Sequence, residues 1–193
     1  MTDPAQRPFK LAVLYRLTEI IKAVTPANGF VSDLADFTDG EGVAMERVFR
    51  GRAWFGADDP LPMISVLEGT APGDDTASEP PMINTQGTDY NWTLLVQGFV
   101  EDAPLHPTDP AYLLLADVRR KLVAERARKL PNDPTTPDVL GLGTGKNRVT
   151  EIHVGPGVVR PADDVSGKAY FWLTITLRIF DYAADPYAYH LSP

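Results

Sequence analysis

The sequence predicts an α+β fold in which two helices cover one face of a single, mainly antiparallel sheet, with long loops between the elements. Three observations favour this class. The elements expected along the chain are a helix, three strands, a second helix and two strands. The last expected strand has a strictly alternating pattern. The 193 residues also include 18 prolines and 15 glycines, which is typical of long connections.

The segment 170–182, YFWLTITLRIFDY, is the clearest strand, because side chains alternate between the two faces of a sheet. One parity is entirely apolar: Phe171, Leu173, Ile175, Leu177 and Ile179. The other parity mixes aromatic residues with threonines and an arginine: Tyr170, Trp172, Thr174, Thr176, Arg178 and Phe180. The apolar parity predicts a core face. The second parity has two interpretations, a further layer of the protein's own core or a sheet face that meets another subunit.

Two amphipathic helices are expected. The first covers residues 9–24, with apolar residues at helical spacing, and Pro26 ends it. The second follows Asp109, a good N-cap, with Pro110 at its first position. Its expected buried stripe is Leu114, Leu115, Val118, Leu122 and Val123.

Basic residues gather in the C-terminal half of the second helix and just beyond it: Arg119, Arg120, Lys121, Arg126, Arg128 and Lys129. Positive charge there complements the helix dipole. The group therefore has two interpretations, a solvated helix end or a docking patch for an acidic partner.

Four further strands are expected over residues 45–55, 63–68, 90–101 and 149–154. In the first of these, Arg50, Arg52 and Trp54 share one parity. The intervening loops include the acidic stretch 32–42, the stretch 71–83, and the long irregular stretch 131–147. We expect one domain over residues 1–182 and a C-terminal tail, 183–193, that has no periodic pattern.

Composition narrows the classes of function. The net charge of −8 argues against a sequence-independent grip on DNA, which needs clustered Lys and Arg, although an acidic surface can line a path along which DNA slides. The absence of cysteine excludes disulfides, thiolate metal sites and cysteine nucleophiles. No apolar run has the roughly 20 residues that a membrane helix needs, and the sequence begins with no apolar signal region.

The sequence contains only weak candidates for catalytic or metal-binding residues. The histidines His106, His153 and His190 are scattered, with no second ligand at a metal-binding spacing. The glycines of GLGTGKNR suggest a phosphate loop, but Leu140 and Asn147 stand where such a loop needs Gly and Ser or Thr. We therefore expect no enzyme activity, no metal and no cofactor.

Five phrases, taken together and in order, resemble the tail terminator (tail completion) proteins of long-tailed bacteriophages and related gene-transfer particles. They are TPANGF at 25–30, VFRGRAWFGADDPLPMISVLEG at 48–69, YNWTLLVQGFVED at 90–102, DPAYLLLADVRRKL at 109–122 and SGKAYFWLTITLRIFDY at 166–182. None of them encodes chemistry alone, and the 131–147 stretch has no counterpart.

The resemblance implies a structural virion protein that forms a hexameric ring at the head-proximal end of the tail tube. Such a ring stops tube growth and offers a surface to the head and its completion proteins, while DNA passes through without specific binding. The implied partners are further copies of the chain, the tail tube protein and the head completion or neck proteins. The implied location is the tail-neck region of the virion, and the host cytoplasm during assembly.

For the ring contact we predict the aromatic and basic parities of two strands: Arg50, Arg52, Trp54, Trp172, Arg178 and Phe180. Two alternatives to a terminator stay open. One is another ring component of the phage neck or tail, either a head–tail adaptor or a tube subunit. The other is a small hydrolase or nucleotide-binding enzyme, whose mark would be a bound ligand or a strongly shifted titratable pair in a cleft.

Overall fold

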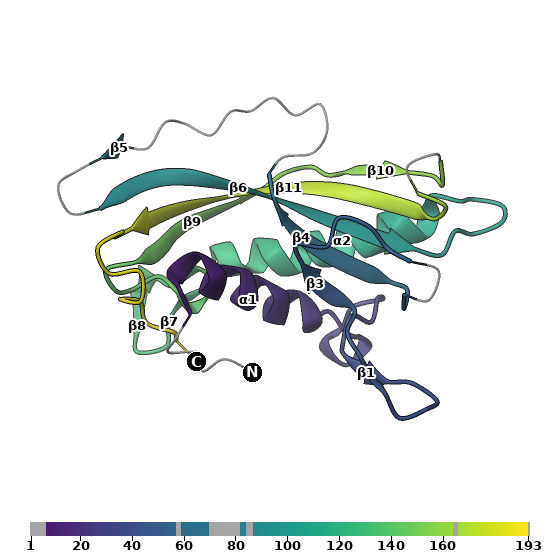
Figure 1. Cartoon of the computed structure of the whole chain (residues 1–193), viewed down its shortest axis with the longest axis horizontal. Helices are drawn as coiled ribbons and strands as arrows, with labels where there is room; N and C mark the ends of the chain where they lie inside the picture. The colour runs from purple at the N-terminus through teal and green to yellow at the C-terminus, as the bar shows by residue number, and fades with distance from the viewer. Residues whose placement is uncertain (1–6, 57–58, 70–81, 84–86, 164–165, 193) are drawn as a thin grey trace.

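The structure is a computed structural model that describes residues 7–56, 59–69, 82–83, 87–163 and 166–192. Its main feature is a seven-stranded sheet, which confirms the predicted α+β class (Figure 1). The main strand order is β10 (Val158–Arg160), β11 (Ala169–Asp181), β6 (Thr88–Val100), β4 (Met63–Glu68) and β3 (Val48–Arg50). In addition, β9 (Arg148–Val154) pairs with β11, and β5 (Met82–Ile83) pairs with β6.

The two longest strands, β6 and β11, form the centre of this sheet. They pair antiparallel over their full lengths, from Ala169 opposite Val100 to Asp181 opposite Thr88. The sheet is mainly antiparallel as predicted, and the parallel pair among its described strands is β3 with β4.

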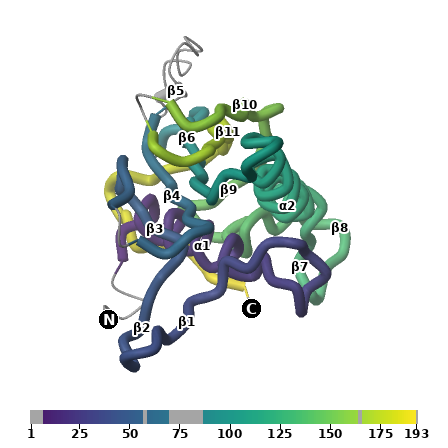
Figure 2. Tube along the Cα trace, turned by 90° about the vertical axis from the view of Figure 1, so that its right-hand side faces the viewer, coloured from purple at the N-terminus to yellow at the C-terminus, as the bar shows by residue number. Residues whose placement is uncertain are grey.

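Both helices, α1 (Phe9–Lys22) and α2 (Asp109–Arg126), lie on the same face of the sheet (Figures 1 and 2). The first helix ends at Lys22, two residues before the predicted end at residue 24, and Thr25 is extended, as expected for the residue before Pro26. The predicted N-cap of α2 is wrong by one position. Thr108 precedes the helix and Asp109 is its first residue, so Pro110, predicted at the first position, is the second.

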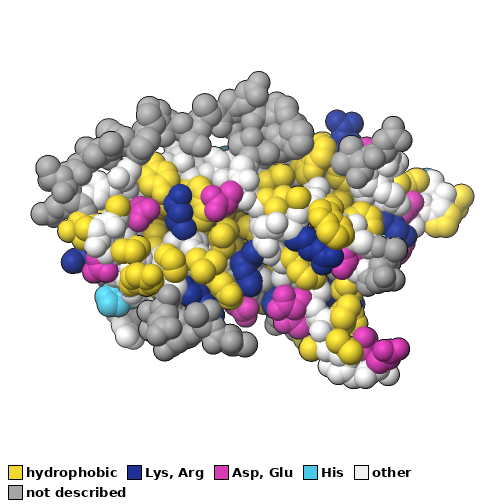
Figure 3. All heavy atoms as spheres, in the orientation of Figure 1, with side chains coloured by type: hydrophobic (Ala, Val, Ile, Leu, Met, Phe, Trp, Pro, Cys, Tyr) yellow, Lys and Arg dark blue, Asp and Glu magenta, His cyan; other side chains and the backbone are white. Residues whose placement is uncertain are grey.

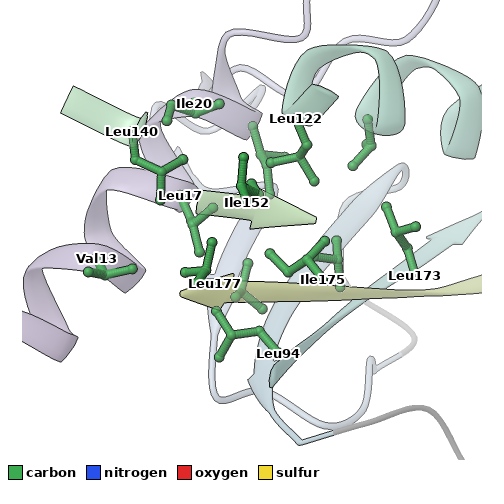
Figure 4. Close-up of a cluster of buried hydrophobic side chains, with 14 of the residues drawn as sticks. Val13, Leu17, Ile20, Leu94, Leu122, Leu140, Ile152, Leu173, Ile175 and Leu177 are labelled. Carbon is green, nitrogen blue, oxygen red and sulfur yellow. The ribbon is translucent and has the colours of Figure 1, made fainter. Parts of the chain in front are cut away.

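The core lies between the helices and the sheet face toward them, which we call the inner face (Figure 4). The predicted apolar parity of β11 is fully buried there, and Ile175 and Leu177 lie near Leu17 of α1 and Leu122 of α2. The stripe predicted for α2 is correct except for Val123, which is 47% exposed. Val123 lies about 100° around the helix from Leu122, beyond the edge of the buried side.

The single strand predicted over residues 45–55 is wrong. The chain instead forms β2 (Ala44–Met45), which pairs with β1 (Phe37–Thr38) in a separate hairpin, and then the short β3. Gly51 follows β3 with φ of 70°, a left-handed conformation that ends regular pairing. Residues 52–56 therefore run without strand structure, and the 32–42 stretch, predicted to be a loop, contains β1.

The 131–147 stretch is more ordered than predicted. It contains β8 (Asp133–Pro137), which pairs with β7 (Lys129–Leu130), and a 3₁₀ turn over Val139–Gly141. In the 71–83 stretch, Met82–Ile83 form β5, and residues 71–81 lie outside the described part of the chain.

Asn147, at the end of that stretch, holds the C-terminal tail against the body. Its backbone N–H donates to the Ala188 carbonyl (2.9 Å), its side-chain amide donates to the Asp185 carbonyl (2.7 Å), and its side-chain oxygen accepts from the Tyr182 N–H (2.5 Å). The Tyr189 ring lies 6.1 Å from the Phe9 ring. The described part of the tail therefore packs on its own subunit.

Candidate subunit-contact surfaces

The sheet face away from the helices, here the outer face, carries a second apolar cluster at one end. We call this cluster the aromatic end: Phe49, Phe55, Met63, Phe99, Tyr170 and Trp172. Met63, Phe99 and Tyr170 are buried and form its centre, and the Trp172 ring meets the Tyr170 ring edge-on at 5.2 Å. The strand register explains the cluster, because Phe99 lies opposite both Met63 and Tyr170. The core interpretation of this parity is therefore correct for Tyr170, whereas Trp172 is half-buried and its contact with another subunit stays a prediction.

The segment after β3 folds over the aromatic end. Phe55 lies against Phe99, with ring centroids 4.7 Å apart. The Arg52 guanidinium lies between the Phe49 and Trp54 rings, at 4.7 and 5.3 Å, and donates to the Asp59 carboxylate at 2.5 Å. Trp54 is 66% exposed. The predicted pair Arg52 and Trp54 therefore lies together, beside the cluster that contains Trp172.

Tyr170 anchors the aromatic end. Burial, followed by the hydrogen bond that its hydroxyl donates to the Asp163 carboxylate at 2.8 Å, raises the pKa of Tyr170 to about 12. The hydroxyl therefore stays protonated at neutral pH and acts as a fixed donor.

The predicted residues Arg178 and Phe180 lie at the opposite end of the outer face. From Trp172 to Phe180 the strand rises about 26 Å, at about 3.3 Å per residue. The Arg178 guanidinium makes two hydrogen bonds to the Asp89 carboxylate, at 3.1 and 3.2 Å. Phe180 is half-buried and lies beneath the Arg148 guanidinium, 4.6 Å away.

Arg50 does not lie on the outer face. Its partner Val66 is on the inner side of the sheet, and its guanidinium lies over the Tyr15 ring (3.8 Å) and donates to the Thr18 hydroxyl (3.0 Å) of α1. The parity shared with Arg52 and Trp54 was inferred from one continuous strand, and the turn at Gly51 breaks that continuity. Of the six predicted residues, the structure thus groups Arg52, Trp54 and Trp172 and separates the other three.

A second surface is the exposed side of α2, and the sequence prediction covered only its charges. We call it the helix face: Tyr112, Leu113, Ala116, Arg119, Arg120, Val123, Ala124 and Arg126. Tyr112, Leu113 and Val123 are 58%, 52% and 47% exposed, so several large apolar side chains share this side of one helix. Aromatic residues and arginine without carboxylates are the composition of interface cores. In the sequence, this surface could have been found from the apolar residues that fall opposite the buried stripe of the helix.

A hollow of about 220 Å³ continues the helix face at its C-terminal end. Arg126, Lys129, Thr150 and His153 contribute to its lining, and Glu151 is the carboxylate among the lining residues. Such a lining suits a carboxylate or another small anion. This explains part of the basic group noted in the sequence, although Arg128 instead lies near Asp138, at 3.4 Å.

The third surface is the acidic hairpin, which we define as residues 31–46, with β1 and β2 as its paired strands. It contains five carboxylates and no Lys or Arg: Asp33, Asp36, Asp39, Glu41 and Glu46. The hairpin projects from the body of the molecule, and acidic side chains gather at its end (Figures 1 and 3). Val31 and Val43 expose apolar surface beside these charges.

Within the described ranges, no group of three or more His, Cys, Asp or Glu side chains is placed to hold a metal ion. None of the helices in the described part combines the length and apolar character that a membrane crossing requires.

Comparison of the sequence with protein-family models finds no match, and comparison with curated proteins finds none either.

Proposed function

We propose that the protein is a structural virion protein, a tail terminator that forms a hexameric ring at the head-proximal end of the tail tube. In this role it ends tube polymerisation and provides the surface on which the head and its completion or neck proteins dock. It acts without catalysis, metal or cofactor, in the virion after assembly in the host cytoplasm.

One observation supports this proposal most. The chain exposes two separate surfaces of interface composition, the aromatic end with Trp54 and the helix face with Tyr112 and Leu113. They lie on different sides of the molecule, because α2 covers the inner face of the sheet and the aromatic end is on the outer face. A ring needs two different surfaces on each subunit, whereas a two-fold dimer needs one. The ordered sequence phrases support the same role.

The net charge of −8 suits a ring through which DNA slides, because clustered cations would hold the DNA backbone. The same two surfaces suit another ring component, a head–tail adaptor or a tube subunit. Electron micrographs of the purified protein separate a terminator from a tube subunit, since a terminator gives closed rings and a tube subunit gives tubes.

The decisive experiment is a knockout of the gene in a producing particle. A tube grows because the exposed end of each ring templates the next ring, and a ring with a different upper face stops growth. We expect the lysate to contain tails of uncontrolled length that do not join heads, and we expect complementation with the wild-type gene to restore particles. Tails of normal length in the knockout would refute the terminator role.

A further inference from the structure

We propose that the acidic hairpin of one subunit docks on the helix face of the next copy of the chain. This inference rests on the proposed ring and names one part of its lateral contact, in addition to the aromatic end. It differs from the sequence-based prediction, which placed the contact on the sheet alone.

The helix face carries positive charge. Arg119 and Arg126 are exposed on the helix face, and no carboxylate forms an ion pair with either among the residues that the structure describes. Lys129 extends the same basic surface to the hollow. In a chain with a net charge of −8, a surface on which Arg119 and Arg126 form no described ion pair favours an acidic partner.

The acidic hairpin of another copy of the chain can supply this acidic partner. Asp36 and Glu46 of the acidic hairpin pair with Lys22, and Asp39 accepts hydrogen bonds from the Glu41 and Val43 N–H groups. Glu41 stands exposed near the tip without an ion pair in the described part of the chain. The valines of the hairpin can cover the apolar residues of the helix face while its carboxylates meet the arginines.

The acidic hairpin and the basic end of α2 lie in different parts of the molecule. The hairpin projects at the lower right of Figure 1, whereas β7, which follows α2 directly, lies at the left. The projecting part of the acidic hairpin and the basic C-terminal end of α2 thus lie toward opposite ends of the long axis of the molecule. Surfaces so placed suit head-to-tail contacts between copies.

The base of the acidic hairpin is held in place by α2 of its own subunit. The Asp117 carboxylate of α2 accepts hydrogen bonds from the Val31 and Ser32 N–H groups, at 2.9 and 2.8 Å. Arg120 donates to the Gly29 carbonyl at 2.6 Å and lies over the Phe30 ring. The hairpin therefore leaves the body from a held start, which lowers the ordering cost of docking.

Two charge-reversal variants test the contact. Arg119→Glu/Arg126→Glu makes the helix face acidic, and Asp33→Lys/Glu41→Lys makes the hairpin basic. Each variant alone places like charges at the contact, and we expect the concentration needed for assembly to rise by at least about tenfold. In an equimolar mixture, each acidic surface meets a basic one, and we expect rings of wild-type mass with alternating subunits.

The controls are Lys121→Glu, on the flank of α2 outside the helix face, and Glu19→Lys, on α1 outside the acidic hairpin. Both should assemble as the wild type does, and circular dichroism melts should show that all variants fold. Solution mass is the measurement. The hairpin contact would be wrong if either double variant still formed rings, or if their mixture did not regain rings. Neither outcome would contradict the ring itself. A wild-type chain that stays monomeric at high concentration would overturn both proposals.

Discussion

The two faces of β11 differ in how completely the chain's own residues cover them. On the inner face, alternate residues from Phe171 to Ile179 are fully buried beneath the helices. On the outer face, Tyr170 is buried, Trp172 is half-buried and Arg178 is exposed beside Asp89. The inner face is complete within the chain, whereas the outer face keeps surface available for a partner. Alternation in a strand therefore predicts which residues share a face but not what covers them.

The largest contrast between the faces should come from Trp172→Asp. The proposed ring would bury this position at each of its repeated contacts, and an unpaired buried charge costs on the order of 3–5 kcal/mol per contact. We expect the variant to keep its fold and to lose ring mass in solution, with Trp172→Phe as the conservative control. A Trp172→Asp protein that still runs as a full ring would exclude the aromatic end from the contact.

Ile175→Ala and the neighbouring Thr174→Ala compare the two faces by stability. Ile175 is fully buried between sheet and helices, so its truncation leaves a cavity and should lower the free energy of unfolding by about 2–5 kcal/mol. Thr174 is half-buried on the outer face, and its truncation should cost less than about 1 kcal/mol. Denaturant melts measure both, and equal losses would mean that the faces are assigned wrongly.

Gly98→Ala tests how tightly the inner face is packed. Gly98 lies opposite Phe171, and an added Cβ would lie 2.2 Å from a carbon of the buried Phe171 ring. Overpacking of this kind costs about 1–3 kcal/mol. Gly167→Ala is the matched control, because no atom lies within 4 Å of its added Cβ. If thermal melts show the same small change for both, the ring of Phe171 has room to move.

A pH dependence of stability is also expected from Tyr170. An unfolded tyrosine has a pKa near 10, so with the folded pKa at about 12 the unfolded chain loses its proton first. The stabilisation is complete below pH 10 and is lost between pH 10 and 12, with a slope of at most about 1.4 kcal/mol per pH unit. Burial also raises the pKa of Tyr90 and Tyr189, so Tyr170→Phe is needed to isolate this residue. The stability gap between wild type and variant should narrow across this range, and parallel curves would argue against the assignment.

The fold was predictable where a periodic pattern is long. The 63–68 strand was predicted with its observed bounds, and those of β6 and β11 agree within two residues, because their alternation extends over many positions. The pattern across residues 45–55 was misleading. Its alternation continued through Gly51, where a left-handed turn interrupts the strand and sends Arg50 to the helix side.

The candidate surfaces were only partly predictable for a related reason. The basic residues of α2 were visible in the sequence, but Tyr112 and Leu113 are ordinary apolar residues until the buried side of the helix is known. The acidic hairpin appeared as a polar loop, because β1 and β2 are two residues long and carry no measurable periodicity. At the end of the 131–147 stretch, Asn147 makes contacts with the tail 35–41 residues away, which no local pattern encodes.

Asp117 links both sides of the proposed lateral contact within one subunit. Its carboxylate holds the start of the hairpin, which reaches one neighbour, while the same helix offers Arg119 and Arg126 to the other neighbour. A shift of α2 on docking would therefore move the hairpin base as well. We expect ring assembly to be cooperative for this reason, with partial arcs scarce beside free subunits and closed rings.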